Sequence, residues 1–186
     1  MTVQYLFDAY AQESFDNSRD HGFWDDKENR NKDEMVMLMI NELSECQEAY
    51  RSSKHNTNLD FLSFEDAIKP EYHNDPSTFA SWYKDNIKGC TGEELADVVI
   101  RIFDFIVGWN IGYNGGKYFY GSTKNFSADL RKLTKLVNAA GDGQSWDYSL
   151  SAIVQFADDW NIDLEYHIKN KQRYNRTRPY KHGKLF

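Results

Sequence analysis

The scarcity of proline is the feature that most constrains the fold of this chain. Its 186 residues contain only three prolines, Pro70, Pro76 and Pro179. Because a proline inside a helix removes a backbone donor and clashes with the preceding turn, the long proline-free stretches are free to form helices. Apolar residues recur in these stretches at spacings of three and four, which is typical of amphipathic helices. The sequence therefore predicts an all-α protein.

We expect five long helices and one irregular connection between them. The connection spans 54–91, where two of the prolines fall, and short helical pieces are expected within it at 63–68 and 77–85. A chain of this length forms one sizeable core, so we assign 1–186 to a single domain. The long helices are expected at 3–17, 33–53, 92–111, 126–140 and 147–173, the last with a break near Asn161.

The composition is that of a globular protein without a membrane partner. No stretch approaches the roughly 18 uninterrupted apolar residues that a membrane helix needs. The first residues, MTVQYLFDAYAQESFD, carry acids and no basic segment ahead of an apolar run, which does not resemble a secretory signal and predicts a cytoplasmic protein. Cys46 and Cys90 form no CxxC pair, so no disulfide framework is expected.

Charge is distributed unevenly along the chain. The net charge is −7, yet the segment from Lys169 to Lys184 holds seven basic residues and no acid. An acidic helical body with one basic end can hold a metal ion in one place and phosphate in another. The alternative is a basic tail that contacts nucleic acid.

The expected helix 33–53 carries a carboxylate inside its apolar stripe. Glu42 lies within the stripe, which includes Met39, Leu43 and Cys46, and Glu45 lies at its edge. An ionised carboxylate in such a stripe costs several kcal/mol unless a positive group meets it. The sequence therefore implies a cationic partner for Glu42.

The expected helix 92–111 is apolar on nearly every side, as is typical of a helix in the middle of a bundle. The exception is a narrow stripe of Glu94, Asp97, Arg101 and Asp104. These residues either ligate a cation or form an ion-pair ladder along the helix, with Arg101 between Asp97 and Asp104. We favour ligation for Glu94 and Asp97, and the ladder for Arg101 with Asp104.

Two such helices packed antiparallel can bring four oxygen donors to one point. Oxygen ligands without cysteine or histidine suit Mg²⁺ or Mn²⁺. A di-iron bundle would need Glu-x-x-His, which does not occur in the sequence. A P-loop is excluded because Ile111 stands at its first glycine position and Tyr118 follows Gly116-Lys117. The predicted ligands are Glu42, Glu45, Glu94 and Asp97.

Together these residues resemble the MazG-like members of the all-α nucleoside triphosphate pyrophosphohydrolases, relatives of the dimeric dUTPases. That family pairs a Glu-Glu-x-x-Glu helix with a Glu-x-x-Asp helix, which 41–45 and 94–97 match, except that Asn41 stands at the first glutamate. A third motif, Lys-x-x-x-Asn followed by Arg, matches Lys171, Asn175 and Arg178.

The resemblance implies a fold, a metal and a reaction. The fold would be a four-helix-bundle core with an additional helical insertion at 113–146 and a basic C-terminal segment at 169–186. Glu42, Glu45, Glu94 and Asp97 would be the catalytic and metal-binding residues, with Mg²⁺ or alternatively Mn²⁺. The reaction would be hydrolysis of a (deoxy)nucleoside triphosphate to its monophosphate and pyrophosphate. Lys171, Asn175 and Arg178 would face the nucleotide. A homodimer or homotetramer is expected.

Several alternatives stay open at this point. Similarity to phage-type members that act on dATP and dGTP favours purine deoxynucleotides, against a pyrimidine specificity of the dUTPase or dCTPase kind. Trp24 and Phe23 would stack on the base or pack against the bundle. Either Glu45 acts as the general base, or a metal-bound hydroxide attacks without a separate base. The helical stripe of Phe126, Leu130, Leu133 and Val137 packs on the bundle or on another subunit, and core packing is favoured. A non-enzymatic helical nucleic-acid-binding module is the rival of a different class; no stable nucleic-acid partner is expected.

Overall fold

A computed structural model describes residues 2–55, 63–116, 118–119 and 121–183. These residues form eight α-helices and no β-strand, so the predicted all-α class is confirmed. The helices are α1 (Val3–Asp20), α2 (Lys32–Arg51), α3 (Phe64–Ala67), α4 (Pro76–Asn86), α5 (Thr91–Gly108), α6 (Phe126–Gly141), α7 (Trp146–Asp159) and α8 (Leu164–Asn175).

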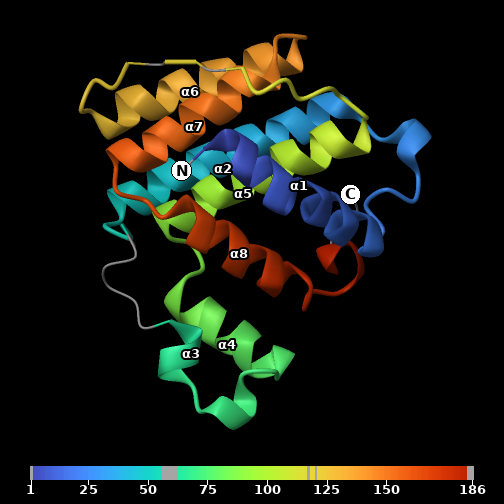
Figure 1. Cartoon of the computed structure of the whole chain (residues 1–186), viewed down its shortest axis with the longest axis vertical. Coiled ribbons are helices and arrows are strands. Elements are labelled where there is room, and N and C mark those ends of the chain that lie inside the picture. The colour runs from blue at the N-terminus through green and yellow to red at the C-terminus, as the bar shows by residue number, and fades with distance from the viewer. Residues whose placement is uncertain (1, 56–62, 117, 120, 184–186) are drawn as a thin grey trace.

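Helix α5 lies at the centre of the molecule. It packs against α1, α2, α7 and α8 (Figure 1), which explains why almost all of its residues are apolar. Helices α2 and α5 run antiparallel. Cys46 near the end of α2 contacts the carbonyl oxygen of Thr91 at the start of α5, whereas Glu42, earlier in α2, reaches Arg101, later in α5. This antiparallel pairing brings the carboxylates of the two helices to one place.

Helices α6 and α7 form a pair on the side of α2, at the top of Figure 1. The predicted core packing of the α6 stripe is confirmed, because Phe126, Leu130, Leu133 and Val137 are all buried in the main core. The expected helix 147–173 is broken, as predicted, at Asn161. This residue has a φ of 52°, a left-handed conformation that asparagine tolerates better than most residues.

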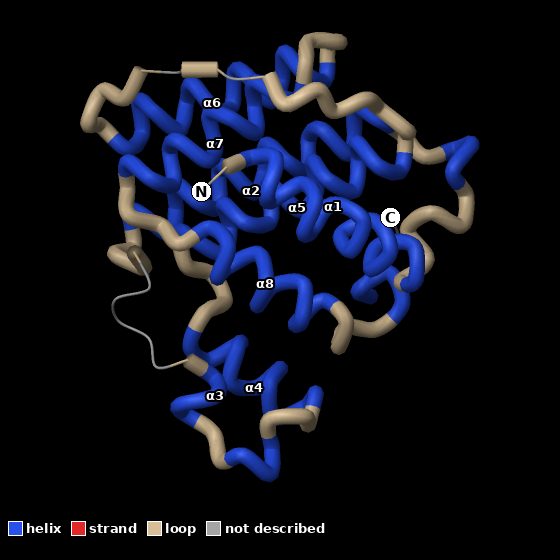
Figure 2. Tube along the Cα trace, viewed as in Figure 1, coloured by secondary structure: helices blue, strands red, loops and turns tan. Residues whose placement is uncertain are grey.

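Helices α3 and α4 form a separate lobe at the lower end of the molecule, visible in Figure 2 below α8. The lobe has its own small core of Phe64, Phe79, Trp82 and Tyr83, and Tyr174 of α8 joins it. The rings of Tyr83 and Tyr174 stack with centroids 4.5 Å apart. The short helices expected in the connection are therefore present, while 56–62 lies outside the described residues.

No helix in the described part of the chain combines the length and the apolar character that crossing a membrane requires.

Helix α2 begins where it does because the Asn31 side chain accepts hydrogen bonds from the backbone N–H groups of Asp33 and Glu34. The acids of this first turn also face the positive end of the helix dipole.

Candidate functional site

Three carboxylates converge between α2 and α5. Glu42 and Glu45 of α2 and Glu94 of α5 each place a possible ligand atom within 4.8 Å of the other two. Glu42 and Glu94 are buried and Glu45 is exposed, so the group is reachable from one side. A group of hard oxygen donors of this kind fits a divalent cation such as Mg²⁺ or Mn²⁺.

Glu94 lies in surroundings that disfavour its negative charge. Burial, followed by the nearby carboxylates of Glu93 and Asp97, raises its pKa to about 9. A carboxyl group in such surroundings holds a proton at neutral pH unless a cation takes the place of that proton. The surroundings of Glu94 are therefore compatible with a cation, which would compete with the proton for this carboxylate.

Asp97, the fourth predicted ligand, does not join the three glutamates. Its carboxylate pairs with the Nζ atom of Lys171 of α8 at 2.5 Å, and the same ammonium group also pairs with Glu93. Burial opposes the charge on Lys171, but the attraction of Asp97 and Glu93 outweighs it and raises the pKa of the ammonium group. A predicted metal ligand and a predicted phosphate ligand thus neutralise each other.

Glu93 is a residue that the sequence analysis missed. Its side chain is only 1% exposed and accepts hydrogen bonds from the Tyr83 hydroxyl at 3.0 Å and from the Gly89 N–H at 2.7 Å, besides pairing with Lys171. Two adjacent glutamates at the start of an apolar helix were the available signal. The signal was weak because acids at a helix start usually serve only the helix dipole.

Arg101 is the cationic partner that the position of Glu42 implied. Its Nε and Nη2 atoms donate to the same oxygen of Glu42, at 2.8 and 2.6 Å. The ion-pair ladder expected along this helix is therefore wrong for Arg101. It is also wrong for Asp104, which accepts hydrogen bonds from Trp24 at 2.7 Å and Arg30 at 3.2 Å. Both residues pair across the structure because α5 is enclosed by other elements.

A cavity of about 270 Å³ adjoins the carboxylate group, between α1, α2, α5 and α8. It gathers side chains from four separate stretches of sequence, and its lining holds five basic and four acidic side chains. The lining residues that matter here are Asp97, Lys171, Asn175 and Arg178, all predicted for the site, together with Arg30, Arg101 and Phe23. Three of the four helices around the cavity carry predicted site residues.

Asn175 presents an acceptor atom that no described residue satisfies. The residue is 9% exposed, lines the cavity, and its Oδ1 atom has no hydrogen-bond partner. A buried polar atom left without a partner costs about 1–3 kcal/mol, so such atoms are uncommon and call for an explanation. A ligand donor in the cavity would supply the missing hydrogen bond.

Trp24 is placed in the core rather than on the cavity wall. It is 8% exposed, its indole donates to Asp104 at 2.7 Å, and its ring packs edge-on against Trp109. The guanidinium of Arg30 lies over the ring, 4.0 Å from its centroid. These contacts support packing over base stacking for Trp24. Its neighbour Phe23 is the aromatic residue that lines the cavity.

The basic C-terminal segment does not form an open cationic stripe. Lys171 is buried between acids, Arg173 pairs with Glu65, and Arg176 pairs with Glu13. Arg178 and Lys181 line the cavity, and Lys184 lies outside the described residues. Lys171 is therefore directed inward, whereas Lys169 is exposed and Arg176 forms an ion pair at the surface.

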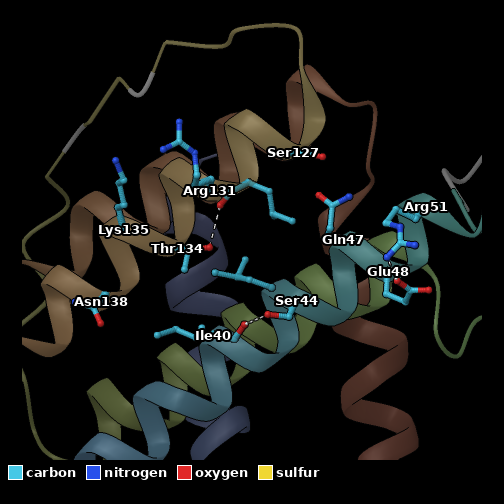
Figure 3. A pocket seen from close by; sticks show the side chains of 12 residues that line it. Ile40, Ser44, Gln47, Glu48, Arg51, Ser127, Arg131, Thr134, Lys135 and Asn138 are labelled. Atoms are coloured by element: carbon cyan, nitrogen blue, oxygen red, sulfur yellow. Dashed lines mark hydrogen bonds and ion pairs between the residues drawn. The ribbon is translucent and has the colours of Figure 1, made fainter.

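A second hollow, of about 630 Å³, is an open groove between α2 and α6 (Figure 3). None of the predicted site residues lines it. The hydroxyls of Ser44 and Thr134 bond to carbonyl oxygens of their own helices, at 3.1 Å each, and Glu48 pairs with Arg51. The polar groups of the groove are thus largely satisfied within single helices, and it does not compete as a reactive site.

Comparison with known proteins gives this chain no relative: no protein-family model, no curated protein and no solved structure matches it.

Proposed function

We propose that this protein is a metal-dependent hydrolase of phosphoanhydrides. More specifically, we propose a MazG-like nucleoside triphosphate pyrophosphohydrolase, with α1, α2, α5 and α8 as its four-helix core. One observation carries the proposal. Residues 42–45, 94–97 and 171–178, selected from the sequence alone, meet at one carboxylate group and the cavity beside it.

The residues of the site divide into two roles. Glu42, Glu45 and Glu94 would hold Mg²⁺ or Mn²⁺, with Asp97 adjacent. A divalent cation in such a site polarises a phosphoryl group and activates water. Lys171 and Arg178 would neutralise the charge of the phosphates, where it is largest in the transition state. The products would be a nucleoside monophosphate and pyrophosphate.

Three residues have roles that follow from their place in the site. Glu45 is the exposed member of the carboxylate group, which supports it as the candidate general base if a separate base is needed. Asn175, with its unsatisfied acceptor, would bind a donor on the sugar or base. Phe23 replaces Trp24 as the candidate for stacking on the base, because it lines the cavity.

Two rival functions make different use of the same residues. In the first, the carboxylates serve only as partners of Arg101 and Lys171 in a structural ion-pair network. In the second, the basic segment binds nucleic acid, which the burial of Lys171 and the ion pairs of Arg173 and Arg176 with acids disfavour. A pyrimidine specificity remains the alternative within the enzyme class, with purine deoxynucleotides as our first choice.

We also propose a homodimer or homotetramer, by resemblance. Met37 of α2, 53% exposed, is an apolar residue on the outer surface that a second copy would cover. Light scattering of the purified protein gives the oligomeric state, and a monomer at all concentrations contradicts this part of the proposal.

The test of function is pyrophosphate release from a panel of dATP, dGTP, dCTP, dUTP and the ribonucleotides, with Mg²⁺ or EDTA. We expect Mg²⁺-dependent release that Glu42→Gln and Asp97→Asn abolish. The control is Glu65→Gln, which removes an exposed carboxylate that does not line the cavity and should retain activity. No release from any nucleotide overturns the proposal, and the preferred base decides between purine and pyrimidine specificity.

A further inference from the structure

Arg101 connects the two parts of the proposed site. Its guanidinium is bonded to Glu42, a member of the carboxylate group, and the same side chain lines the cavity. Glu42 itself does not line the cavity. Arg101 is therefore the side chain through which a change at the carboxylate group reaches a ligand in the cavity.

We propose that Arg101 is a phosphate-binding residue that exchanges partners. It neutralises Glu42 when no divalent cation is bound, and it turns to a phosphate oxygen of the triphosphate when a cation takes Glu42. This inference rests on the proposed function, because it assumes that the cavity receives a triphosphate beside a metal ion. It assigns to Arg101 a role outside the motifs that suggested the function.

The physical reason begins with burial. The side chain of Glu42 is only 10% exposed, and a buried carboxylate without a positive neighbour is strongly destabilising. Either Arg101 or a divalent cation can supply that neighbour. A cation held by Glu42, Glu45 and Glu94 would share the negative charge of Glu42 with Arg101, so the binding of a cation weakens the attraction between Glu42 and Arg101.

The shape and exposure of Arg101 suit it to a second partner. Only Nε and Nη2 bond to Glu42, so the Nη1 donors take no part in this ion pair. A guanidinium offers five donors in a planar fork that matches phosphate oxygens. The side chain is 34% exposed, compared with 7% for Lys171, so Arg101 is the less confined of these two cavity cations.

Partner exchange makes the binding of metal and triphosphate cooperative. A cation that binds alone competes with Arg101 for the charge of Glu42 without offering Arg101 a new anion. A triphosphate that binds alone must draw Arg101 away from Glu42. When both bind, each removes the obstacle to the other, and the coupling is reciprocal by thermodynamic linkage.

The experiment measures Mn²⁺ binding by titration calorimetry, with and without a triphosphate analogue whose α,β bridge cannot be hydrolysed. For the wild-type protein we expect weak Mn²⁺ binding that the analogue tightens. For Arg101→Gln we expect tighter Mn²⁺ binding in the absence of the analogue, by on the order of tenfold, and little further tightening when it is added. A merely structural role for Arg101 predicts weaker Mn²⁺ binding in the variant, the opposite sign.

Two more variants sharpen the test. The matched control is Arg51→Gln, which removes an arginine paired with Glu48 on α2 at 2.9 Å, outside the cavity, and should bind Mn²⁺ as the wild type does. Arg101→Lys keeps the charge and loses the fork. It should leave binding of Mn²⁺ alone close to wild type while reducing the tightening by the analogue. Should Arg101→Gln fail to fold, this second variant decides.

The outcomes separate the inference from the proposed function. Equal Mn²⁺ affinities for wild type and Arg101→Gln, or full tightening by the analogue in either Arg101 variant, overturn the role of Arg101 and leave the function standing. An absence of Mn²⁺ binding in every protein, with or without the analogue, overturns the proposed function itself.

Discussion

Lys171 of α8 donates to Asp97 of α5 at 2.5 Å. This ion pair holds α8 against the central helix α5 at the wall of the cavity. The same ammonium group pairs with Glu93, whose other partners are Tyr83 of α4 and the backbone of Gly89. One lysine therefore links α8, α5 and the α3–α4 lobe. Structure and proposed phosphate binding depend on the same charge.

The first prediction concerns the stability that Lys171 contributes. Lys171→Met leaves Glu93 and Asp97 buried without their cation, and we expect a loss of about 3 kcal/mol in the free energy of unfolding. Urea denaturation measures it. Adding Glu93→Gln to Lys171→Met should recover part of the loss, because one of the uncompensated charges is removed.

A surface ion pair provides the control for this prediction. Arg176 pairs with Glu13, but its side chain is 56% exposed, so Arg176→Gln should cost less than about 1 kcal/mol. Equal losses for Lys171→Met and Arg176→Gln would contradict the role we assign to the buried network.

The second prediction tests the packing of Trp24 against α5. A Cβ atom at Gly108 would overlap the six-membered ring of Trp24, which its hydrogen bond to Asp104 holds in place. Gly108→Ala improves helix propensity by about 1 kcal/mol, but overpacking a core costs about 1–3 kcal/mol. Because the ring is confined, we expect the overlap to dominate and the melting temperature to fall.

Gly112 is the matched control, since a Cβ there meets nothing within 4 Å. Gly112→Ala should leave the melting temperature within a few degrees of wild type. If Gly108→Ala is as stable as wild type, Trp24 is free to move, and its exclusion as a base-stacking residue no longer holds.

Much of the fold was predictable because it depends on local periodicity. The stripe on α6 and the break at Asn161 are visible as spacing and as a residue type that tolerates left-handed backbone. Glu42 and Glu45 could be selected because a spacing of three places both on one helix face. These features need no knowledge of neighbouring elements.

The partners of the charged residues were not predictable in the same way. Arg101 lies four residues after Asp97 and could pair along the helix or across to α2, and only the packing of the two helices decides between them. Glu93 is buried by α4, which lies in a connection without regular apolar periodicity. Trp24 lies in the loop before α2. Outside a regular helix, the spacing of residues does not predict which way a side chain points.

The third prediction follows from Asp104. Burial raises the pKa of this carboxyl to about 6, although Arg30 and the hydrogen bonds from Trp24 and Ser18 oppose the change. The ordinary pKa of an aspartate side chain is 3.8, so the folded state binds the proton more tightly than the unfolded state. The contribution of Asp104 to stability is therefore fully present below about pH 4 and is lost as the pH rises to about 6.

The measurement compares wild type with Asp104→Asn by urea denaturation between pH 4 and 7. Relative to the variant, wild type should lose about 2–3 kcal/mol over this range, since a pKa difference of one unit corresponds to about 1.4 kcal/mol. Asp129 gives a control of opposite sign. Burial opposes the charge on Asp129, but hydrogen bonds from Thr123 and Ser122 outweigh it and lower its pKa.

Wild type compared with Asp129→Asn should therefore lose stability as the pH falls, not as it rises. Identical pH profiles for the two comparisons would show that the surroundings of Asp104 do not disfavour its charge.

The last prediction separates function from stability at Asn175. Its Oδ1 atom is buried and has no hydrogen-bond partner, so replacing the amide with a side chain of similar size should cost the folded protein little. We expect the free energy of unfolding of Asn175→Leu to lie within about 1 kcal/mol of the wild-type value. We expect this variant to bind the triphosphate analogue roughly tenfold more weakly, as the loss of one hydrogen bond to a ligand implies.

The control is Asn170→Ala, on the same helix. It removes an amide that donates to the carbonyl oxygen of Tyr166 at 2.9 Å and should leave analogue binding unchanged. Titration calorimetry with the analogue and Mn²⁺ measures analogue binding by both variants. A large loss of stability with intact binding in Asn175→Leu would assign this residue to the core. It would contradict the proposed role of Asn175 in binding the sugar or base.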